Sequence, residues 1–413
     1  MHLSRLIEHV VRTDGRRVLA AVARLTGDLD AAEEALQEAY ARALVAWRRD
    51  GIPASPGAWL NTVARRIAID RLRRERRAEL PDGLAAPDPE PPEPQDIEDD
   101  RLRLLFVCCH PALRPDARQA LALRILGGLT TREIARAFVE PEPTTAQRIV
   151  RAKRKIREAR IPYEVPSPRE LPARLADVLA VIYLIFNEGY TSTGAPSLMR
   201  PDLTSEAIRL GRLVVELLPA SAEASGLLSM MLLTDARRAA RISPDGSLVP
   251  LEDQDRTVWN RAQIEEGTRL LDAALSARTP GPYQVQAAIA ALHAAAAAPE
   301  DTDWPQIAAL YRALLQWSPT PVVELNAAVA LGMAGDHTGA LDWIGRIEAT
   351  GALARYHLLY ASKADLHRRL GRVPEAIAAY RAALAFVTNA AERAYLETRL
   401  SALEEASGPC RSP

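Results

Sequence analysis

Residues 129–158 read LTTREIARAFVEPEPTTAQRIVRAKRKIRE, and the order of turn-forming, apolar and basic residues in this stretch decides the fold around it. A short helix is predicted after Thr130 or Thr131, because either hydroxyl can cap a helix N-terminus. A proline-rich turn follows, and Pro143 suits the first turn of a second, longer helix. An apolar helix and a Gly-Gly break precede the stretch, so the layout is typical of a helix–turn–helix motif.

The second of these helices is strongly basic. Residues 148–160 carry seven Lys or Arg and one acid, although the formal net charge of the chain is −1. Helical spacing turns Ile149, Ala152 and Ile156 toward the core. A solvated face would explain the charge alone, but a basic helix that closes a helix–turn–helix has a partner in DNA phosphates. We therefore predict that this helix enters a DNA groove and that the cations of 153–157 hold phosphates.

A second basic run and an acidic run precede this motif. Residues 65–77, RRIAIDRLRRERR, hold seven Arg against two acids, whereas residues 81–100 hold eight acids, six prolines and no base. A segment so polar and proline-rich cannot bury a core or continue a helix, so 81–97 is predicted to be an acidic linker. Such basic–acidic–basic patterning bears on the partners that the chain binds.

Helices are predicted at residues 3–11, 15–25, 29–49 and from Trp59 to about Arg77. The polar side of the last helix can track a single strand and hold unstacked bases. The alternative is a basic surface helix in which Trp59 merely packs in the core. In the helix over 29–49, three polar residues share one stripe, namely Glu34, Gln37 and Glu38.

Several protein classes are disfavoured by composition. No apolar run approaches the ~20 residues of a membrane span, and no signal peptide is expected at the N-terminus. Three cysteines are too few for a disulfide framework, so a cytoplasmic location is expected. Cys108, Cys109 and His110 make a metal candidate, but packing is favoured because no second ligand pair stands at zinc spacing. We expect no metal, no cofactor and no enzyme, since phosphate loops and nucleophile elbows are absent.

The chain from residue 171 onward is Ala/Leu-rich and helical in pattern. YRALL at 311–315 returns as YRAAL at 380–384, and MAGDHTGAL at 333–341 aligns with RLGRVPEAI at 369–377. This alignment pairs two turn glycines and two small residues, which is typical of tetratricopeptide repeats. The paired residues are Gly335 with Gly371 and Ala340 with Ala376.

Some polar residues of this region stand in apolar contexts. They are Asn187, Glu188, Tyr190, Asp253, Asp255 and Arg256. Buried structural hydrogen bonds are the favoured interpretation, ahead of a ligand or partner site. Catalysis is disfavoured, because no paired carboxylates or nucleophile–base set accompanies them.

Together these segments resemble one family. DAAEEALQEAYARALVAW with PGAWLNTVARRIAIDRLRR resembles region 2 of an extracytoplasmic-function (ECF) sigma factor of bacterial RNA polymerase, and 129–158 resembles its region 4. The remainder, with YLIFNEGY at 183–190, resembles the subfamily with a tetratricopeptide-like extension. The resemblance implies an all-α chain with four parts: region 2 at 1–80, the linker at 81–97, region 4 at 98–165 and the extension at 171–413.

The resemblance also implies partners and roles. Such a protein binds core RNA polymerase, including its β subunit, and opens selected promoters. Docking on the β′ clamp coiled coil is implied for Glu34, Gln37 and Glu38. Reading of the −10 element is implied for Trp59, Asn61, Thr62, Arg65, Arg66, Arg73 and Arg74. Reading of the −35 element is implied for Thr144, Thr145, Gln147, Arg148, Arg151, Lys153, Arg154 and Lys155.

Departures from the family pattern at Pro143 and Ala146 prevent the promoter sequence from being carried over. Two alternatives stay open. One is a helix–turn–helix repressor or activator that does not replace sigma, and the other is an enzyme in the C-terminal half. The extension is expected to bind a protein on its concave face or to dock on the sigma core of the same chain.

Overall fold

The computed structural model describes residues 10, 14–79, 99–138, 140–167, 169–191, 199–243 and 246–407. Within these ranges the regular elements are helices, and a single isolated antiparallel bridge joins Ile242 to Leu248. The all-α prediction is therefore confirmed. The linker at 81–97 and most of the helix predicted at 3–11 lie outside the described residues. The chain forms two compact units, Met1–Ile185 and Phe186–Pro413, and each is described by itself.

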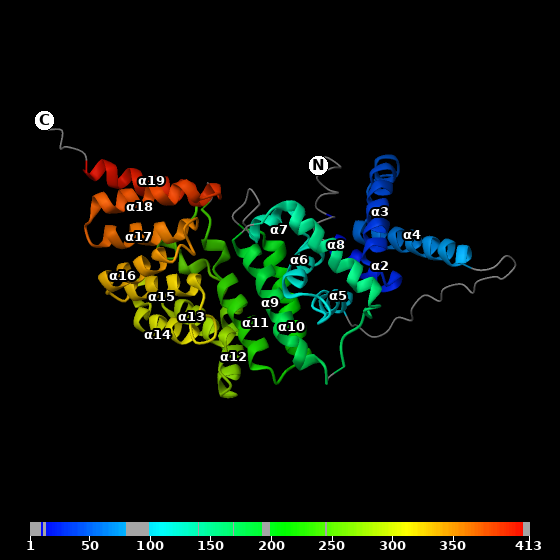
Figure 1. Ribbon diagram of the computed structural model, residues 1–413, viewed down its shortest axis with the longest axis horizontal. Helices are drawn as coiled ribbons and strands as arrows, with labels where there is room; N and C mark the ends of the chain where they lie inside the picture. Colours follow the sequence, from blue (N-terminus) through cyan, green and yellow to red (C-terminus); the bar gives the residue numbers. More distant parts are fainter. Residues whose placement is uncertain are drawn as a thin grey trace. The chain divides into compact units, whose positions relative to one another are not determined.

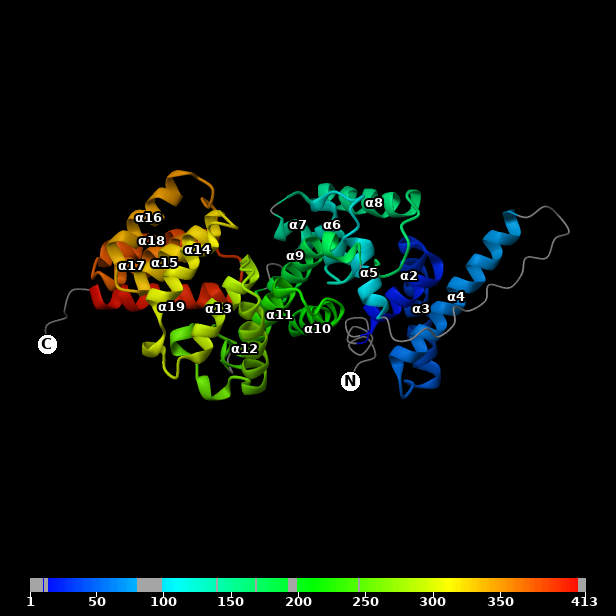
Figure 2. The same cartoon turned by 90° about the horizontal axis from the view of Figure 1, so that it is seen from below.

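The first module of the N-terminal unit consists of α2 (Gly15–Thr26), α3 (Leu29–Asp50) and α4 (Pro56–Glu79), which pack pairwise. Gly27 ends α2 at φ 65°, a left-handed conformation that favours glycine. Asp28 then caps α3, because its carboxylate accepts from the backbone N–H of Asp30 at 2.7 Å. The C-terminal half of α4 projects away from α2 and α3 (Figures 1 and 2).

The second module consists of α5 (Asp100–Cys108), α6 (Pro115–Ile125), α7 (Thr131–Ala137) and α8 (Glu142–Glu158). Thr130 and Glu133 form a capping box at the start of α7, as the Thr130 prediction requires. On α8 the predicted core residues Ile149, Ala152 and Ile156 are all buried. The helix–turn–helix is thus α7 followed by α8, and both helices pack on α6.

Helix α9 (Leu171–Tyr190) begins where the extension was expected to begin, but its residues up to Ile185 belong to the N-terminal unit. Arg118 of α6 forms an ion pair with Asp177 of α9. Arg174 donates to the backbone carbonyl of Phe106 in α5, and its guanidinium lies over the Phe106 ring. The start of α9 therefore contacts α5 and α6, the two helices that precede the helix–turn–helix.

The C-terminal unit continues with helices that mostly pack on their neighbours in sequence. They are α10 (Pro201–Leu217), α11 (Ala222–Asp235), α12 (Arg261–Ser276), α13 (Pro282–Ala295), α14 (Trp304–Leu314), α15 (Pro321–Met333), α16 (His337–Ala349), α17 (His357–Arg369), α18 (Val373–Phe386) and α19 (Ala390–Ser407). Gly335 and Gly371 occupy the turns before α16 and α18 with φ of 107° and 69°. Ala340 and Ala376 are fully buried. The aligned sequence segments therefore form two equivalent helix pairs.

The polar residues singled out in this unit divide into two groups. Glu188 and Arg256 are buried, and the Tyr190 hydroxyl accepts from Arg237 Nε at 3.0 Å. The interpretation as buried structural groups is wrong for the other three, because they are exposed: Asn187, Asp253 and Asp255.

Arg256 shows what a buried arginine of this unit does. It donates to the carbonyls of His293 and Ala296 at 2.9 and 2.6 Å, at the end of α13, where helix carbonyls lack intrahelical partners. Burial, and then the charges of Arg237 and Arg256, lower the pKa of His293 to about 4. The imidazole is therefore neutral at physiological pH, and the cluster is structural.

Candidate nucleic-acid and polymerase interface

The polar stripe of α3 lies on the surface, as predicted. Glu34, Gln37 and Glu38 are all exposed. Glu34 forms an ion pair with Arg71 of α4, and Glu38 accepts from Arg42 one turn later at 2.7 Å. Exposed pairs of this kind are worth about 0–1 kcal/mol, so a partner can displace them at little cost.

The start of α4 is built around two tryptophans. The Trp59 ring is half-buried and meets the buried Trp47 ring edge-on, with centroids 5.5 Å apart and an interplanar angle of 66°. Packing against Trp47 therefore explains why this position holds a tryptophan, as the alternative reading of Trp59 proposed. Among the other predicted residues, Thr62 and Arg66 are exposed, whereas Asn61 and Arg65 are half-buried.

The projecting part of α4 presents a cationic surface. Arg73, Arg74 and Arg77 line a hollow of about 410 Å³ together with Asp70. Three guanidinium groups against one carboxylate suit an anionic ligand such as a phosphate backbone. The sequence prediction stopped at Arg74 and missed Arg77. The i, i+3 and i+7 spacing from Asp70 was the signal that could have found it.

One side of α8 opens toward solvent. Thr144, Gln147, Arg151 and Lys155 are exposed and follow one another at helical spacing. With Arg114 and Asp116 at the start of α6, they line a groove of about 420 Å³. Arg114 was missed because it lies 30 positions before Thr144 in the chain and only the fold brings the two together. This surface joins base-reading and phosphate-binding residue types.

Arg148 also lines this groove, but its guanidinium is already paired with acidic side chains. Its guanidinium makes two hydrogen bonds to Glu140, at 2.7 and 2.6 Å, and an ion pair with Asp116 at 3.2 Å. Only 19% of its side chain is exposed, and it lies over the Phe138 ring. The guanidinium to which the family resemblance assigned a −35 contact is therefore paired with carboxylates of the same module.

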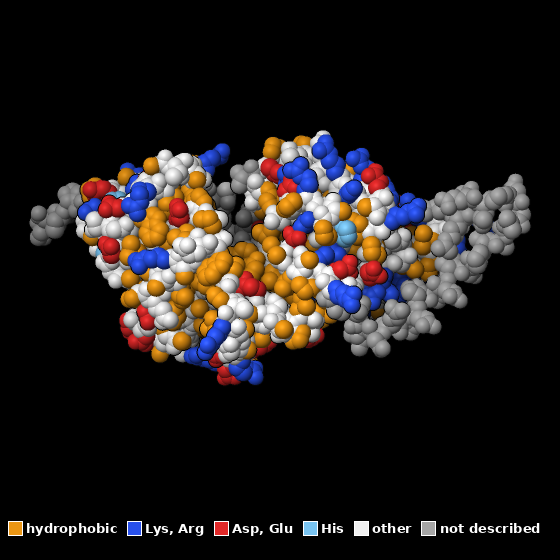
Figure 3. Space-filling model, turned by 60° about the horizontal axis from the view of Figure 1, so that its bottom comes forward, with side chains coloured by type: hydrophobic (Ala, Val, Ile, Leu, Met, Phe, Trp, Pro, Cys, Tyr) orange, Lys and Arg blue, Asp and Glu red, His pale blue; other side chains and the backbone are white. Residues whose placement is uncertain are grey.

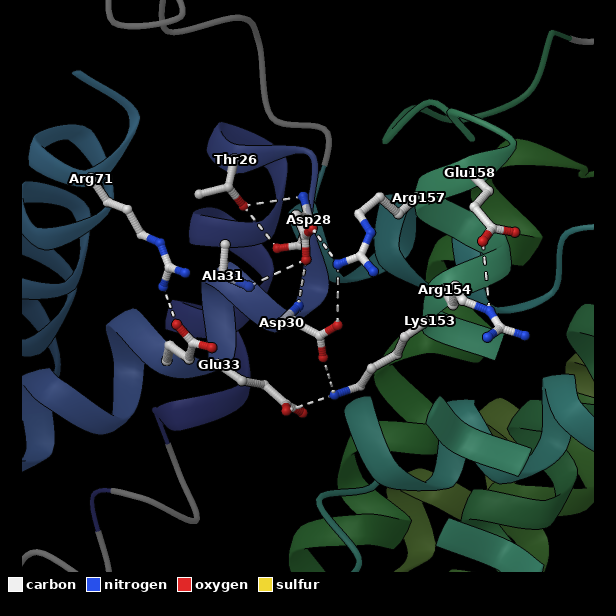
Figure 4. Close-up of polar contacts among 11 residues, drawn as sticks. Thr26, Asp28, Asp30, Ala31, Glu33, Arg71, Lys153, Arg154, Arg157 and Glu158 are labelled. Atoms are coloured by element: carbon white, nitrogen blue, oxygen red, sulfur yellow. Dashed lines mark hydrogen bonds and ion pairs between the residues drawn. The ribbon is translucent and has the colours of Figure 1, made fainter. Parts of the chain in front are cut away.

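Two further DNA contacts predicted on α8 are placed elsewhere by the structure. Thr145 is fully buried, and its hydroxyl donates to Glu140. Lys153 is 10% exposed and forms ion pairs with Asp30 and Glu33 of α3 at 3.1 and 2.7 Å (Figure 4). Arg154 is exposed and lies 3.6 Å from Glu158. Figure 3 shows Lys and Arg side chains on the surface of the N-terminal unit with Asp and Glu side chains among them.

The adjacent cysteines are part of the core. Cys108 and Cys109 are fully buried, and burial raises the pKa of both thiols, so they stay protonated. Burial, followed by the charges of Arg174 and Arg118, lowers the pKa of His110. The described part of the chain holds no group of three or more His, Cys, Asp or Glu suited to a metal. No helix in that part is long and apolar enough to cross a membrane.

Comparison with known proteins now decides the family. The models of sigma-70 region 2 and sigma-70 region 4 match residues 10–78 and 103–156. The ECF RNA polymerase sigma factor SigK of Mycobacterium tuberculosis is 34% identical over 151 residues, which cover 34% of this chain and 78% of SigK. The chain belongs to the ECF sigma factors of the sigma-70 family. A second relative of this sigma factor is the probable ECF sigma factor SigI of the same species, at 34% identity over 50% of its length.

Two further matches include the extension of this sigma factor. An uncharacterized protein of Rhizobium meliloti is 44% identical over 397 residues, which cover 94% of this chain and 93% of that protein. Residues 174–275 match a family of unknown function (DUF6596). No solved structure matches the chain. The tetratricopeptide resemblance of the extension therefore stays a prediction, carried by the helix pairs around Gly335 and Gly371.

Proposed function

We propose that this sigma factor divides promoter recognition between two surfaces of its N-terminal unit and docks on core polymerase through a third. The basic end of α4 contacts the melted −10 region, and the open groove of α8 reads the −35 element. The exposed stripe of α3 binds the β′ clamp coiled coil. A helix–turn–helix regulator that does not replace sigma would explain residues 98–165 but not the match to region 2.

One observation carries the −35 assignment. The groove between α6 and α8 combines an exposed amide, Gln147, with three exposed cations, Arg114, Arg151 and Lys155. Glutamine can bond adenine and arginine can bond guanine in a major groove, while lysine and arginine also hold phosphates. The buried side of α8 and the hydrogen bonds of Arg148 to Glu140 hold this helix in place. The exposed side chains of the groove are therefore presented by a rigid helix.

The test is selection of duplexes from a random-sequence pool by the holoenzyme, followed by sequencing. Wild-type protein should enrich a −35 motif, and Gln147→Ala with Arg151→Ala should degrade that motif at two adjacent positions. The control variant is Arg169→Gln, which removes an exposed cation outside the helix–turn–helix. An unchanged motif in the double variant would show that another surface reads the −35 element.

Docking on polymerase is tested on the α3 stripe. Glu34→Arg with Glu38→Arg reverses two exposed charges without touching a buried residue. Charge pairs that become buried in an interface cost about 2–5 kcal/mol when one partner is removed. Loss of co-elution with core polymerase is expected. Glu265→Arg with Asp272→Arg makes the same charge change at two exposed positions of α12 and serves as the control.

We also propose that the extension regulates or recruits through protein contact, on the sigma core or on a separate partner. It is tested by run-off transcription from a promoter that contains the selected motif. The truncation should end after Tyr190, because an end at residue 165 would delete the part of α9 that pairs with Arg118 and Phe106. A several-fold change in transcript yield is expected, and wild-type yield from residues 1–190 would refute a regulatory role.

A further inference from the structure

The loop between α5 and α6 forms one wall of the groove that α8 lines. Ala112, Leu113 and Arg114 of this loop all face the groove. Arg118 of α6 donates to the backbone carbonyls of Leu113 and Pro111, at 2.9 and 3.1 Å. One guanidinium therefore fixes two peptide groups of the wall.

Arg114 is the residue of this wall that can meet DNA. Its side chain is 86% exposed and lies 3.4 Å from Asp116. It is the N-cap of α6 and has an extended backbone with ψ of 150°, so the loop sets the point from which its side chain enters the groove. Holding the loop therefore also holds this cation in place.

Asp177 of α9 is the counter-ion of Arg118. The two side chains form an ion pair, and only 12% of the Arg118 side chain is exposed. An arginine this buried needs a charged partner, because it has lost most of its hydration. Asp177 is fixed in turn, because its backbone carbonyl lies 3.9 Å from Cys109 Sγ and its neighbour Arg174 donates to the carbonyl of Phe106.

The counter-ion comes from outside the sigma-70 region 4 match. That match ends at residue 156, whereas Asp177 lies within the match of 174–275 to the family of unknown function. Arg174 and Asp177 stand three positions apart and therefore share one face of α9. The first helix of the extension thus supplies the carboxylate that a buried arginine of the helix–turn–helix module requires.

We propose that Arg118 is a positioning residue for −35 recognition, and that Asp177 of the extension holds Arg118 in the orientation that keeps Arg114 at the groove. The proposal rests on the proposed function of this groove. Arg118 itself does not contact DNA, because its three nitrogens already serve two carbonyls and one carboxylate. The first helix of the extension then belongs to the −35 recognition machinery.

The test is a double-mutant cycle on the holoenzyme with the −35 duplex obtained by selection. Arg118→Lys keeps the charge, but one ammonium group cannot serve the three partners of a planar guanidinium. Arg114→Ala removes the cation of the wall. Titration should give losses of affinity of about threefold for Arg118→Lys and about fivefold for Arg114→Ala. The double variant should also lose about fivefold, because Arg118 acts through Arg114. A merely structural Arg118 would multiply the two losses to about 15-fold.

The part played by the extension is tested on Asp177. Asp177→Asn and the control Glu164→Gln each remove one negative charge, and Glu164 is exposed before α9 begins. Removal of negative charge alone favours DNA binding in both variants. Asp177→Asn should nevertheless lose about twofold in affinity, whereas Glu164→Gln should lose none. Equal affinities of the two variants would overturn the role of Asp177.

Hydrogen exchange of the full-length chain separates loop movement from unfolding. The N–H of Ala112 bonds to His110 Nδ1 at 3.1 Å and the N–H of Leu113 bonds to the His110 carbonyl at 2.9 Å, so both amides report on the loop. Arg118→Lys should exchange about fivefold faster at these amides, with peptides of α8 within about twofold of wild type. Equally faster exchange throughout α8 would overturn a specific positioning role.

The outcomes distinguish this proposal from the groove assignment. If Gln147→Ala with Arg151→Ala leaves the selected motif unchanged, the groove assignment falls and the positioning role falls with it. If that variant degrades the motif while Arg114→Ala or Arg118→Lys keeps wild-type affinity, the positioning role alone falls. It also falls alone if the double variant loses the product of the two single losses.

Discussion

Helices α4 and α8 look alike in sequence and differ in the folded protein. Each carries a run with seven cations and one or two acids. The end of α4 projects from its module (Figure 2). There Arg73, Arg74 and Arg77 line a hollow together with Asp70. Helix α8 is instead enclosed by acids from three other segments, which take up Arg148, Lys153 and Arg157. The number of cations in a helix therefore does not give the number that can reach DNA.

The largest effect is expected on α4. Arg73→Ala with Arg74→Ala and Arg77→Ala removes three exposed cations, and affinity for a 20-nucleotide single strand at 50 mM salt should fall about 100-fold. The slope of log affinity against log salt should fall by about two units, since each phosphate contact on a single strand contributes about 0.7. Fluorescence anisotropy between 50 and 200 mM salt measures both quantities.

The matched control for α4 is Arg132→Ala with Arg136→Ala and Arg169→Ala, which removes the same charge from two exposed positions of α7 and one exposed position just before α9. Its salt slope should stay within about half a unit of wild type. A control that loses as much affinity as the α4 variant would mean that net charge, and not the hollow, governs single-strand binding.

The next effect separates Arg148 from its neighbours on α8. Arg148→Ala leaves Glu140 without its cation in a site where only 15% of that side chain is exposed, so the module should lose about 2–3 kcal/mol of stability. Hydrogen exchange of peptides from α7 and α8 measures the loss. Arg151→Ala, at an exposed position of the same helix, should change exchange by less than about 0.5 kcal/mol.

A smaller effect distinguishes residues of the open groove that recognise bases from residues that only contact phosphates. Arg151→Ala should cost about 1–2 kcal/mol on the selected −35 duplex and much less on a scrambled one, whereas Lys155→Ala should weaken both duplexes equally. Titration of the holoenzyme with each duplex gives the four affinities. If both variants lose the same affinity on the selected and the scrambled duplex, Arg151 contacts a phosphate and Gln147 is the residue that recognises a base.

The smallest effect compares how α7 and α8 begin. Thr130→Ala removes both hydroxyl contacts of the capping box and should cost about 1 kcal/mol in α7. Thr144→Ala should cost little, because the N-cap of α8 is Pro141 and no side chain caps this helix. Hydrogen exchange in the first turn of each helix measures the loss of local stability in the two variants. Equal destabilisation would mean that Thr144 also supports the fold.

Local pattern predicted much of this molecule. Helices α2, α3, α4, α7 and α8 lie near the expected positions, because apolar periodicity and caps act within a few residues. The Thr130 cap and the burial of Ile149 and Ile156 follow for the same reason. The positive φ of Gly335 and Gly371 is likewise a local requirement that the sequence displays as a repeated glycine.

The sequence by itself determined that this is an all-helical ECF sigma factor with a basic helix–turn–helix and a helical extension. Only the tertiary structure decided which cations of α8 are open. Asp116 reaches Arg148 from 32 positions away, and Glu33 reaches Lys153 from 120 positions away. Such pairings depend on how helices pack across the chain, and helical periodicity carries no information about the charge that will face a residue from another helix.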